Sequence, residues 1–176
     1  MGLHYSIYPN KKTNCENNFS NGLSFFFEQV GGYGETAEVE QVSKILNIDL
    51  FAFQDVEYDA ENPKDVEKSW KNIDSFSAIV DTFITRIENN PDYYKKVVHN
   101  PDKEKQDDKH AEILQIKDTA MALKFMEDLQ KEPLYMYPPD YGYLSEGRLL
   151  KDLKILKKTL NCFKQDGVTK IRLEYS

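Results

Sequence analysis

The chain has 176 residues, of which 40% are hydrophobic and 12% aromatic, and this is enough for one compact domain with a buried core. Charged residues make up 30% of the chain and there are only 8 glycines and 7 prolines, which argues against general disorder and against a fibrous or low-complexity protein. The formal net charge of −7 makes nucleic acid a poor partner, because an acidic chain repels phosphate.

The first part of the chain predicts a strand, an aromatic segment and a short helix. Alternating apolar residues from Leu3 to Ile7, followed by Pro9, are typical of a half-buried strand. Three consecutive phenylalanines lie between Leu23 and Val30, and they cannot all share one helical face. Apolar residues at helical spacing predict a helix over Thr36 to Leu46, and the short run from Ile48 to Phe53 predicts a strand.

Three longer helices and a last strand are expected after this. The first begins near Asp65, includes Trp70 and ends at Pro91, and the second runs from about Ala111 to Lys131. Between them, residues 100–109 contain almost nothing that could be buried, which predicts a mobile polar loop. The third helix is expected to start at a Ser145 cap and to end at Gly167, before a strand over residues 168–175.

These elements predict a single α+β domain over residues 1–176. Its sheet should be small, antiparallel or mixed, and should contain both terminal strands. Three long amphipathic helices should pack on one face of it.

Neither an export signal nor a run of eighteen apolar residues is recognisable, so we expect a cytoplasmic protein without a membrane partner. Cys15 and Cys162 lie far apart and lack metal-ligand spacing, which favours reduced thiols.

His4, His99 and His110 have no histidine or cysteine at ligand spacing and no nucleophile nearby. We therefore expect no metal, no cofactor and no catalytic residue, and a protein that is not an enzyme.

The negative charge is concentrated in one stretch. Residues 35–67 contain ten acidic residues against two basic residues, a local charge of −8. Within it, Asp55, Glu57, Asp59 and Glu61 alternate along the chain but lack the glycine and the twelfth-position glutamate of a calcium loop. One acidic face, which serves either a positively charged partner or solubility, is the favoured interpretation.

A second stretch has the composition of a recognition surface. Tyr135, Tyr137, Tyr141 and Tyr143 surround two prolines and Asp140, and tyrosines on a stiff segment offer large contact area at small entropic cost. A loop packed over the core is an equally good interpretation. If the acidic stretch lies beside this segment, tyrosine anchors with an acidic rim would suit a basic protein.

Three features together resemble the small acidic immunity proteins of bacterial polymorphic toxins. They are the opening Met1-Gly2-Leu3 strand, the helix that contains Trp70 and ends at Pro91, and the block from Tyr141 to Leu150 that leads through an amphipathic helix to the terminal strand. This resemblance implies a non-enzymatic cytoplasmic protein that binds a cognate toxin domain and blocks its active site.

Two other functions stay open at this point. A small enzyme or ligand-binding protein would have a pocket between helices and sheet, with His4, Tyr5 or His99 inside it. A structural or oligomerisation module would instead bury the cluster Phe25, Phe26 and Phe27 against another molecule.

Overall fold

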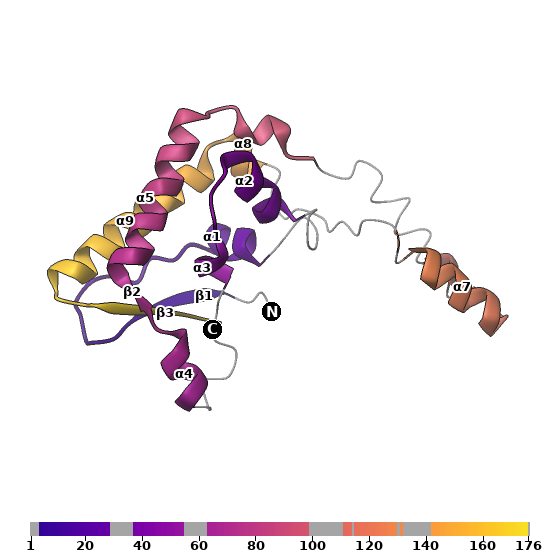
Figure 1. The fold of residues 1–176 in the computed structure, drawn as a ribbon, viewed down its shortest axis with the longest axis horizontal. Coiled ribbons are helices and arrows are strands. Elements are labelled where there is room, and N and C mark those ends of the chain that lie inside the picture. Colours follow the sequence, from indigo (N-terminus) through magenta and orange to yellow (C-terminus); the bar gives the residue numbers. More distant parts are fainter. Residues whose placement is uncertain are drawn as a thin grey trace.

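The structure is a computed structural model, and it describes residues 4–28, 37–54, 63–98, 111–113, 115–129, 131 and 142–175. Figure 1 shows the arrangement of the elements. In chain order they are β1 (Tyr5–Pro9), α1 (Asn21–Phe27), α2 (Glu38–Leu46), α3 (Phe51–Gln54), α4 (Pro63–Ser69), β2 (Lys71–Asn72), α5 (Ile73–Asn89), the 3-10 helix η2 (Tyr93–Lys96), α7 (Thr119–Leu129), α8 (Gly142–Ser145), α9 (Arg148–Gln165) and β3 (Lys170–Tyr175).

The predicted α+β class is confirmed, and so is a small sheet that contains both terminal strands. The sheet is antiparallel with the order β1-β3-β2, and Ile7 lies opposite Leu173. The outer edge of β1 is covered by side chains, since the backbone N–H of Tyr5 donates to Ser24 Oγ at 3.0 Å and that of Ile7 donates to Asn17 Oδ1 at 3.4 Å. An edge strand whose donors are occupied is protected from pairing with another chain.

One face of the sheet carries the core. Tyr5, Ile7, Ile171 and Leu173 are buried there, because alternate residues of a strand point to the same side. The long helices α5 and α9 run side by side above the sheet in Figure 1. On the other face, the Arg172 guanidinium lies 4.9 Å from the centre of the Trp70 ring and forms an ion pair with Glu174.

The long helix expected from Asp65 to Pro91 is interrupted, so this prediction is wrong in its first part. α4 ends at Ser69, β2 pairs Lys71 with Ile171 of β3, and α5 begins afresh at Ile73. The Asn72 side chain caps α5 by accepting from the N–H groups of Asp74 and Ser75 at 2.9 and 3.0 Å. The spacing of the apolar residues predicts one continuous helix. The pairing of β2 with β3 and the Asn72 cap divide it into two helices.

Two local predictions are also corrected. Residues 48–53 do not form a strand, because α2 ends with Asn47 in the left-handed conformation (φ 50°) and α3 starts four residues later at Phe51. The third long helix begins at Arg148 after Gly147, whose φ is 72°, and Ser145 belongs to α8 instead of capping α9. Both turns need positive φ, which glycine adopts freely and asparagine tolerates.

The prediction of reduced thiols is wrong, because Cys15 and Cys162 form a disulfide with a Cα–Cα distance of 5.9 Å. The bond fastens the segment between β1 and α1 to α9. Hydrogen bonds reinforce the same junction, since Thr13 Oγ1 donates to Asp166 Oδ2 at 2.5 Å and Asn10 Nδ2 donates to Thr169 Oγ1 at 3.1 Å. Fold geometry brings these cysteines together although 147 positions separate them in sequence.

The second long helix is shorter than expected and does not pack on the sheet. It is α7, Thr119–Leu129, and residues 111–113 form a separate helical stretch. α7 stands away from the other elements in Figure 1, and none of its described side chains is buried. The expected loop at residues 100–109 lies outside the described residues.

Candidate protein-binding surface

A series of aromatic contacts links α3, which lies in the acidic stretch 35–67, with α8, which follows the tyrosine-rich stretch. The rings of Tyr143 and Phe26 lie 6.4 Å apart, those of Phe26 and Phe27 5.1 Å apart, and those of Phe27 and Phe53 4.2 Å apart and nearly parallel. Phe53 lies two residues before Asp55, and Tyr143 ends the tyrosine-rich segment. Phe53, inside the acidic stretch 35–67, and Tyr143, at the end of the tyrosine-rich segment, therefore belong to the same aromatic cluster.

Tyr143 belongs to the core, which corrects its prediction as an exposed anchor. It is 8% exposed, and its hydroxyl donates to Asp152 Oδ2 on α9 at 3.0 Å. Ser20 Oγ donates to the same oxygen at 2.5 Å while it caps α1 by accepting from the N–H of Leu23 at 3.1 Å. Burial raises the pKa of the Tyr143 hydroxyl and the Asp152 carboxylate raises it further, so the hydroxyl stays protonated and donates.

Replacement of Tyr143 by phenylalanine tests this role. We expect the Tyr143→Phe variant to lose about 1–3 kcal/mol of unfolding free energy, because a hydrogen bond to a charged acceptor is removed in a partly buried site. Urea unfolding followed by far-ultraviolet circular dichroism measures it. Unchanged stability would contradict the structural role of the hydroxyl.

Gly22 is the matching test from the other side of the contact. A Cβ at this position would meet the Tyr143 ring, with Cζ at 2.8 Å, and Asp152 Oδ2 at 2.9 Å. Gly22→Ala should therefore destabilise the protein by roughly 1–3 kcal/mol although alanine is the better helix former. Urea unfolding measures the change, and a stabilised Gly22→Ala protein would contradict the close contact of Gly22 with Tyr143 and Asp152.

The other predicted partner-binding residues lie outside the described residues. They are Tyr135, Tyr137, Asp140, Tyr141, Asp55, Glu57, Asp59 and Glu61. Their predicted role stays a prediction.

The described acidic residues of the stretch 35–67 mostly have contacts within the molecule. Glu38 is 6% exposed at the start of α2, where a helix favours negative charge. Glu40 accepts from Gln54 Nε2 at 3.2 Å, and Asp49 accepts from the N–H of Phe51 at 2.9 Å. Asp49 and Glu67 are nevertheless exposed, so both contribute to the acidic surface of the described residues.

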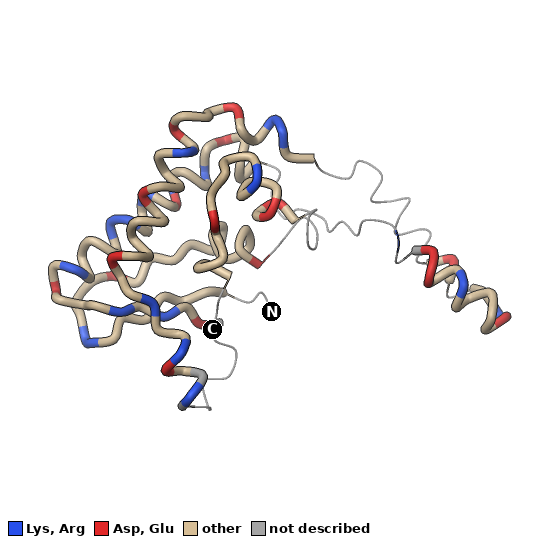
Figure 2. Tube along the Cα trace, in the orientation of Figure 1, with Lys and Arg blue, Asp and Glu red and all other residues tan. Residues whose placement is uncertain are grey.

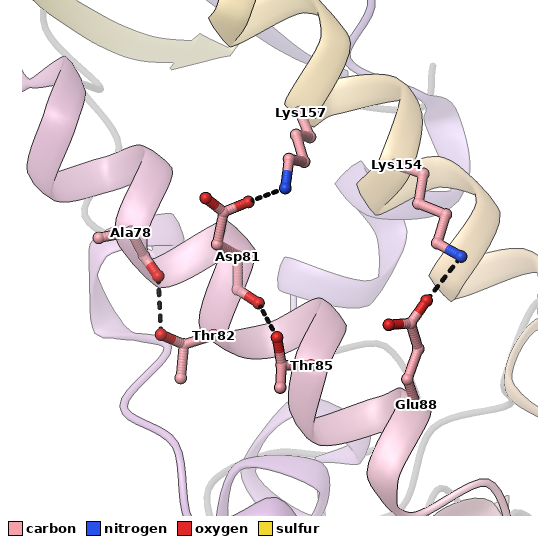
Figure 3. A network of polar contacts seen from close by, with 7 residues as sticks. All are labelled: Ala78, Asp81, Thr82, Thr85, Glu88, Lys154 and Lys157. Atoms are coloured by element: carbon pink, nitrogen blue, oxygen red, sulfur yellow. Dashed lines mark hydrogen bonds and ion pairs between the residues drawn. The ribbon is translucent and has the colours of Figure 1, made fainter.

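The lysine face of α9 pairs with α5. Lys154 binds Glu88 at 2.7 Å and Lys157 binds Asp81 at 2.6 Å, as Figure 3 shows, and Lys164 lies 3.5 Å from Asp74. The pairs are solvent-exposed, so each adds only about 0–1 kcal/mol. Figure 2 shows these charges distributed along both helices. The positive charge of these α9 lysines is thus partly neutralised by the neighbouring helix.

The alternative of an enzyme or ligand-binding protein places His4, Tyr5 or His99 in a pocket between helices and sheet. Tyr5 is 3% exposed within the core, and His99 lies outside the described residues. A surface hollow of about 540 Å³ lies along α9 between Gly147 and Lys158, and neither Tyr5 nor His4 lines it. The described residues contain no group of three or more histidine, cysteine, aspartate or glutamate side chains placed to hold a metal ion.

The phenylalanine cluster is internal to the molecule. Phe26 and Phe27 are 2% and 1% exposed, while Phe25 is half-buried near His4. This corrects the alternative in which the cluster is buried against another molecule.

An exposed apolar helix is the feature that the sequence interpretation missed. Met121, Leu123 and Met126 of α7 are 62%, 56% and 44% exposed. The expected amphipathic helix over Ala111 to Lys131 should pack on the sheet, whereas these side chains of α7 are exposed. A sequence pattern shows that a helix has an apolar face and does not show what covers that face.

The fold and its surface define the class of the protein as an α+β protein with a three-stranded antiparallel sheet in the described residues and helices on one face. No family model, curated protein or solved structure matches the chain. Among the described helices, none combines the length and apolar character that crossing a bilayer requires.

Proposed function

We propose that this chain is an immunity protein, which binds a cognate, basic toxin domain and blocks its activity without being an enzyme itself. The observation that carries the proposal is the aromatic cluster from Tyr143 through Phe26 and Phe27 to Phe53. It brings Tyr143, the last tyrosine of the tyrosine-rich segment, and Phe53, two residues before Asp55, into the same core.

This arrangement supports the proposal because recognition segments work best on a rigid scaffold. Tyrosines supply contact area, and the alternating residues Asp55, Glu57, Asp59 and Glu61 supply charge that favours a basic partner. Tyr135, Tyr137 and Tyr141 remain as the proposed anchors, with Asp140 among them. Tyr143 holds the segment instead of contacting the partner.

A cytoplasmic location belongs to the proposal only through the resemblance to immunity proteins. The disulfide between Cys15 and Cys162 is instead typical of oxidising compartments. Alkylation of free thiols at the moment of cell lysis, followed by mass spectrometry, distinguishes a reducing from an oxidising compartment. Alkylated Cys15 and Cys162 would support a cytoplasmic location, and cysteines protected from alkylation would contradict it.

Capture from the native cells tests the function. Tagged full-length protein should retain one stoichiometric, basic partner at low salt and release part of it at moderate salt, because exposed charges are screened. The captured partner should be toxic when expressed alone and harmless when expressed with this chain. Retention of no such partner at either salt concentration would overturn the proposal.

Replacement of Tyr135 and Tyr137 together by alanine tests the proposed anchors. We expect the double variant to bind the captured toxin more weakly by about 2–4 kcal/mol, which is the effect of removing interface hot spots. Isothermal titration calorimetry measures it. Tyr8→Ala is the matched control, since Tyr8 is an exposed tyrosine on β1 (39%) outside the proposed surface. Equal losses in both variants would refute the assignment.

A further inference from the structure

The segment that connects β1 with α1 lies beside the outer edge of the sheet and buries very little of itself (Figure 1). We call residues 10–19 the strap. None of its side chains is buried, and only Thr13, Cys15 and Phe19 are half-buried. Apolar packing therefore contributes little to holding the middle of the strap against the domain.

The disulfide and one carboxylate attach the middle of the strap to α9 and its C-terminal cap. Asp166 Oδ2 accepts from Thr13 Oγ1 at 2.5 Å and from the N–H of Asn14 at 3.3 Å. These two hydrogen bonds, that of Thr13 above all, lower the pKa of Asp166, which therefore stays ionised at neutral pH. Asp166 is exposed, so water competes for both bonds. The covalent bond is thus the strongest attachment of this part of the strap.

The strap closes one hydrogen-bonding position on the outer edge of β1. The N–H groups of Tyr5 and Ile7 point outward, since they donate to Ser24 and Asn17 instead of to β3. Pro9 has no N–H to offer. Ser24 belongs to α1, so only the Asn17 contact depends on the strap. Its length of 3.4 Å is long for a hydrogen bond, which indicates that it is easily lost once the strap moves.

We propose that the disulfide is a redox switch for this edge, and that its reduction by a dithiol releases the strap and uncovers the N–H of Ile7. In this reaction the S–S bond between Cys15 and Cys162 breaks and two cysteine thiols form, while the two thiols of the reductant become a disulfide. Two electrons and two protons pass from the reductant to the protein. Both cysteines are half-buried, so a small dithiol reaches the bond. The inference does not rest on the proposed function.

The release should be local, because both ends of the strap are attached independently of the disulfide. At its start, Asn10 Nδ2 donates to Thr169 Oγ1 at 3.1 Å, and the N–H of Asn10 donates to the carbonyl of Lys170 at 3.0 Å. At its end, the rings of Phe19 and Tyr5 lie 5.8 Å apart. These contacts remain when the disulfide is reduced, so the sheet keeps its place while the middle of the strap moves away.

The switch gives the two redox states different surfaces. In an oxidising compartment the strap covers the edge of β1, which protects it from pairing with another chain. In a reducing compartment the same edge presents a free donor at Ile7, and an open edge is a template for the addition of a strand.

Hydrogen exchange of single backbone amides, followed by NMR on the full-length chain, tests the inference. Ile7 is the reporter, and Ser6 and Tyr8 are the reference amides, because they pair with Glu174 and Arg172 of β3 on the same strand. Dithiothreitol should raise the exchange rate of Ile7 at least tenfold more than the rates of the reference amides. A disulfide that only stabilises the whole domain would raise all three rates by one factor, since exchange would then follow global unfolding.

Two variants with an intact disulfide separate the part played by the strap from that of the covalent bond. Asn17→Ala removes the acceptor, so it should speed the exchange of Ile7 without any reductant and leave the reference amides unchanged. Asn18→Ala is the matched control, because Asn18 is exposed and its side chain donates to Glu16 within the strap. It should match the wild-type rates in both redox states.

Limited trypsin digestion gives a second readout of the same release. Lys11 and Lys12 are exposed in the strap, and a backbone segment that detaches becomes a better protease substrate. Cleavage after these lysines should be at least tenfold faster in the reduced protein. The variant Cys15→Ser with Cys162→Ser should be cut at the reduced rate with or without dithiothreitol.

The outcomes are decisive without any toxin, so they are independent of the capture experiment. Equal acceleration of Ile7 and the reference amides would make the disulfide a purely structural bond and overturn the inference. An unchanged Ile7 rate or unchanged cleavage in the strap would overturn it as well. So would a reduced chain that unfolds completely in native buffer, since the release would then not be local.

Discussion

Replacing Cys15 and Cys162 together by serine should lower the free energy of unfolding by about 2–4 kcal/mol, the typical contribution of a native disulfide. The bond joins positions 147 residues apart and closes nearly the whole chain into one loop. A cross-link over so long a loop restricts the unfolded chain strongly, and this is the main source of the stabilisation in the chain-entropy description. Chemical denaturation at neutral pH measures the change.

A reducing agent provides the control for this prediction. Dithiothreitol should lower the stability of the wild-type protein to that of the double serine variant and should leave the variant unchanged. If the reduced and oxidised wild-type proteins unfold at the same denaturant concentration, the disulfide contributes nothing and the prediction fails. Ellman titration of the protein unfolded without reductant should find no free thiol.

Replacing Phe53 by alanine should destabilise the protein by about 3–5 kcal/mol, the range observed for aromatic residues removed from a core. Phe53 is 0% exposed and its ring stacks on that of Phe27 at 4.2 Å, with Phe76 on another side at 4.7 Å. The substitution leaves a large cavity beside Phe27 and Phe76. This cavity cannot close easily, because the two rings belong to different helices. Denaturant unfolding of the purified variant measures the loss.

Phe51 offers a matched control on the same short helix. It is 65% exposed, so Phe51→Ala makes the same chemical change outside the core and should alter stability by less than about 0.5 kcal/mol. Phe53→Leu, which refills part of the cavity, should recover part of the loss. Similar losses for Phe51→Ala and Phe53→Ala would mean that α3 is not anchored by Phe53.

Phe53→Ala also has a functional consequence under the proposed function. The residue anchors α3 two positions before Asp55, so its loss should free the chain at this point from the aromatic cluster. We expect weaker toxin binding in the variant under conditions where it remains folded. The control Phe51→Ala should bind as wild type does.

The amino-acid sequence by itself determined the elements whose patterns are local. The alternation before Pro9, the apolar positions of α2, the body of α9 from Leu149 to Phe163, and the terminal strand were all predictable, because burial of one face imposes a period on the sequence. The α+β class followed from the order of these elements.

Only the tertiary structure decided the features that depend on distant neighbours. Pairing with β3 divides the expected helix at Lys71 and Asn72. Phe53 packs against Phe27, and the apolar run around Phe53 forms a helical turn instead of the expected strand. Tyr143 is a core residue because Asp152 and Phe26 lie beside it, and Cys15 meets Cys162 because β1 and β3 pair. The apolar face of α7 shows the same limit, since periodicity reveals that a face is apolar while only the fold shows whether the molecule covers it.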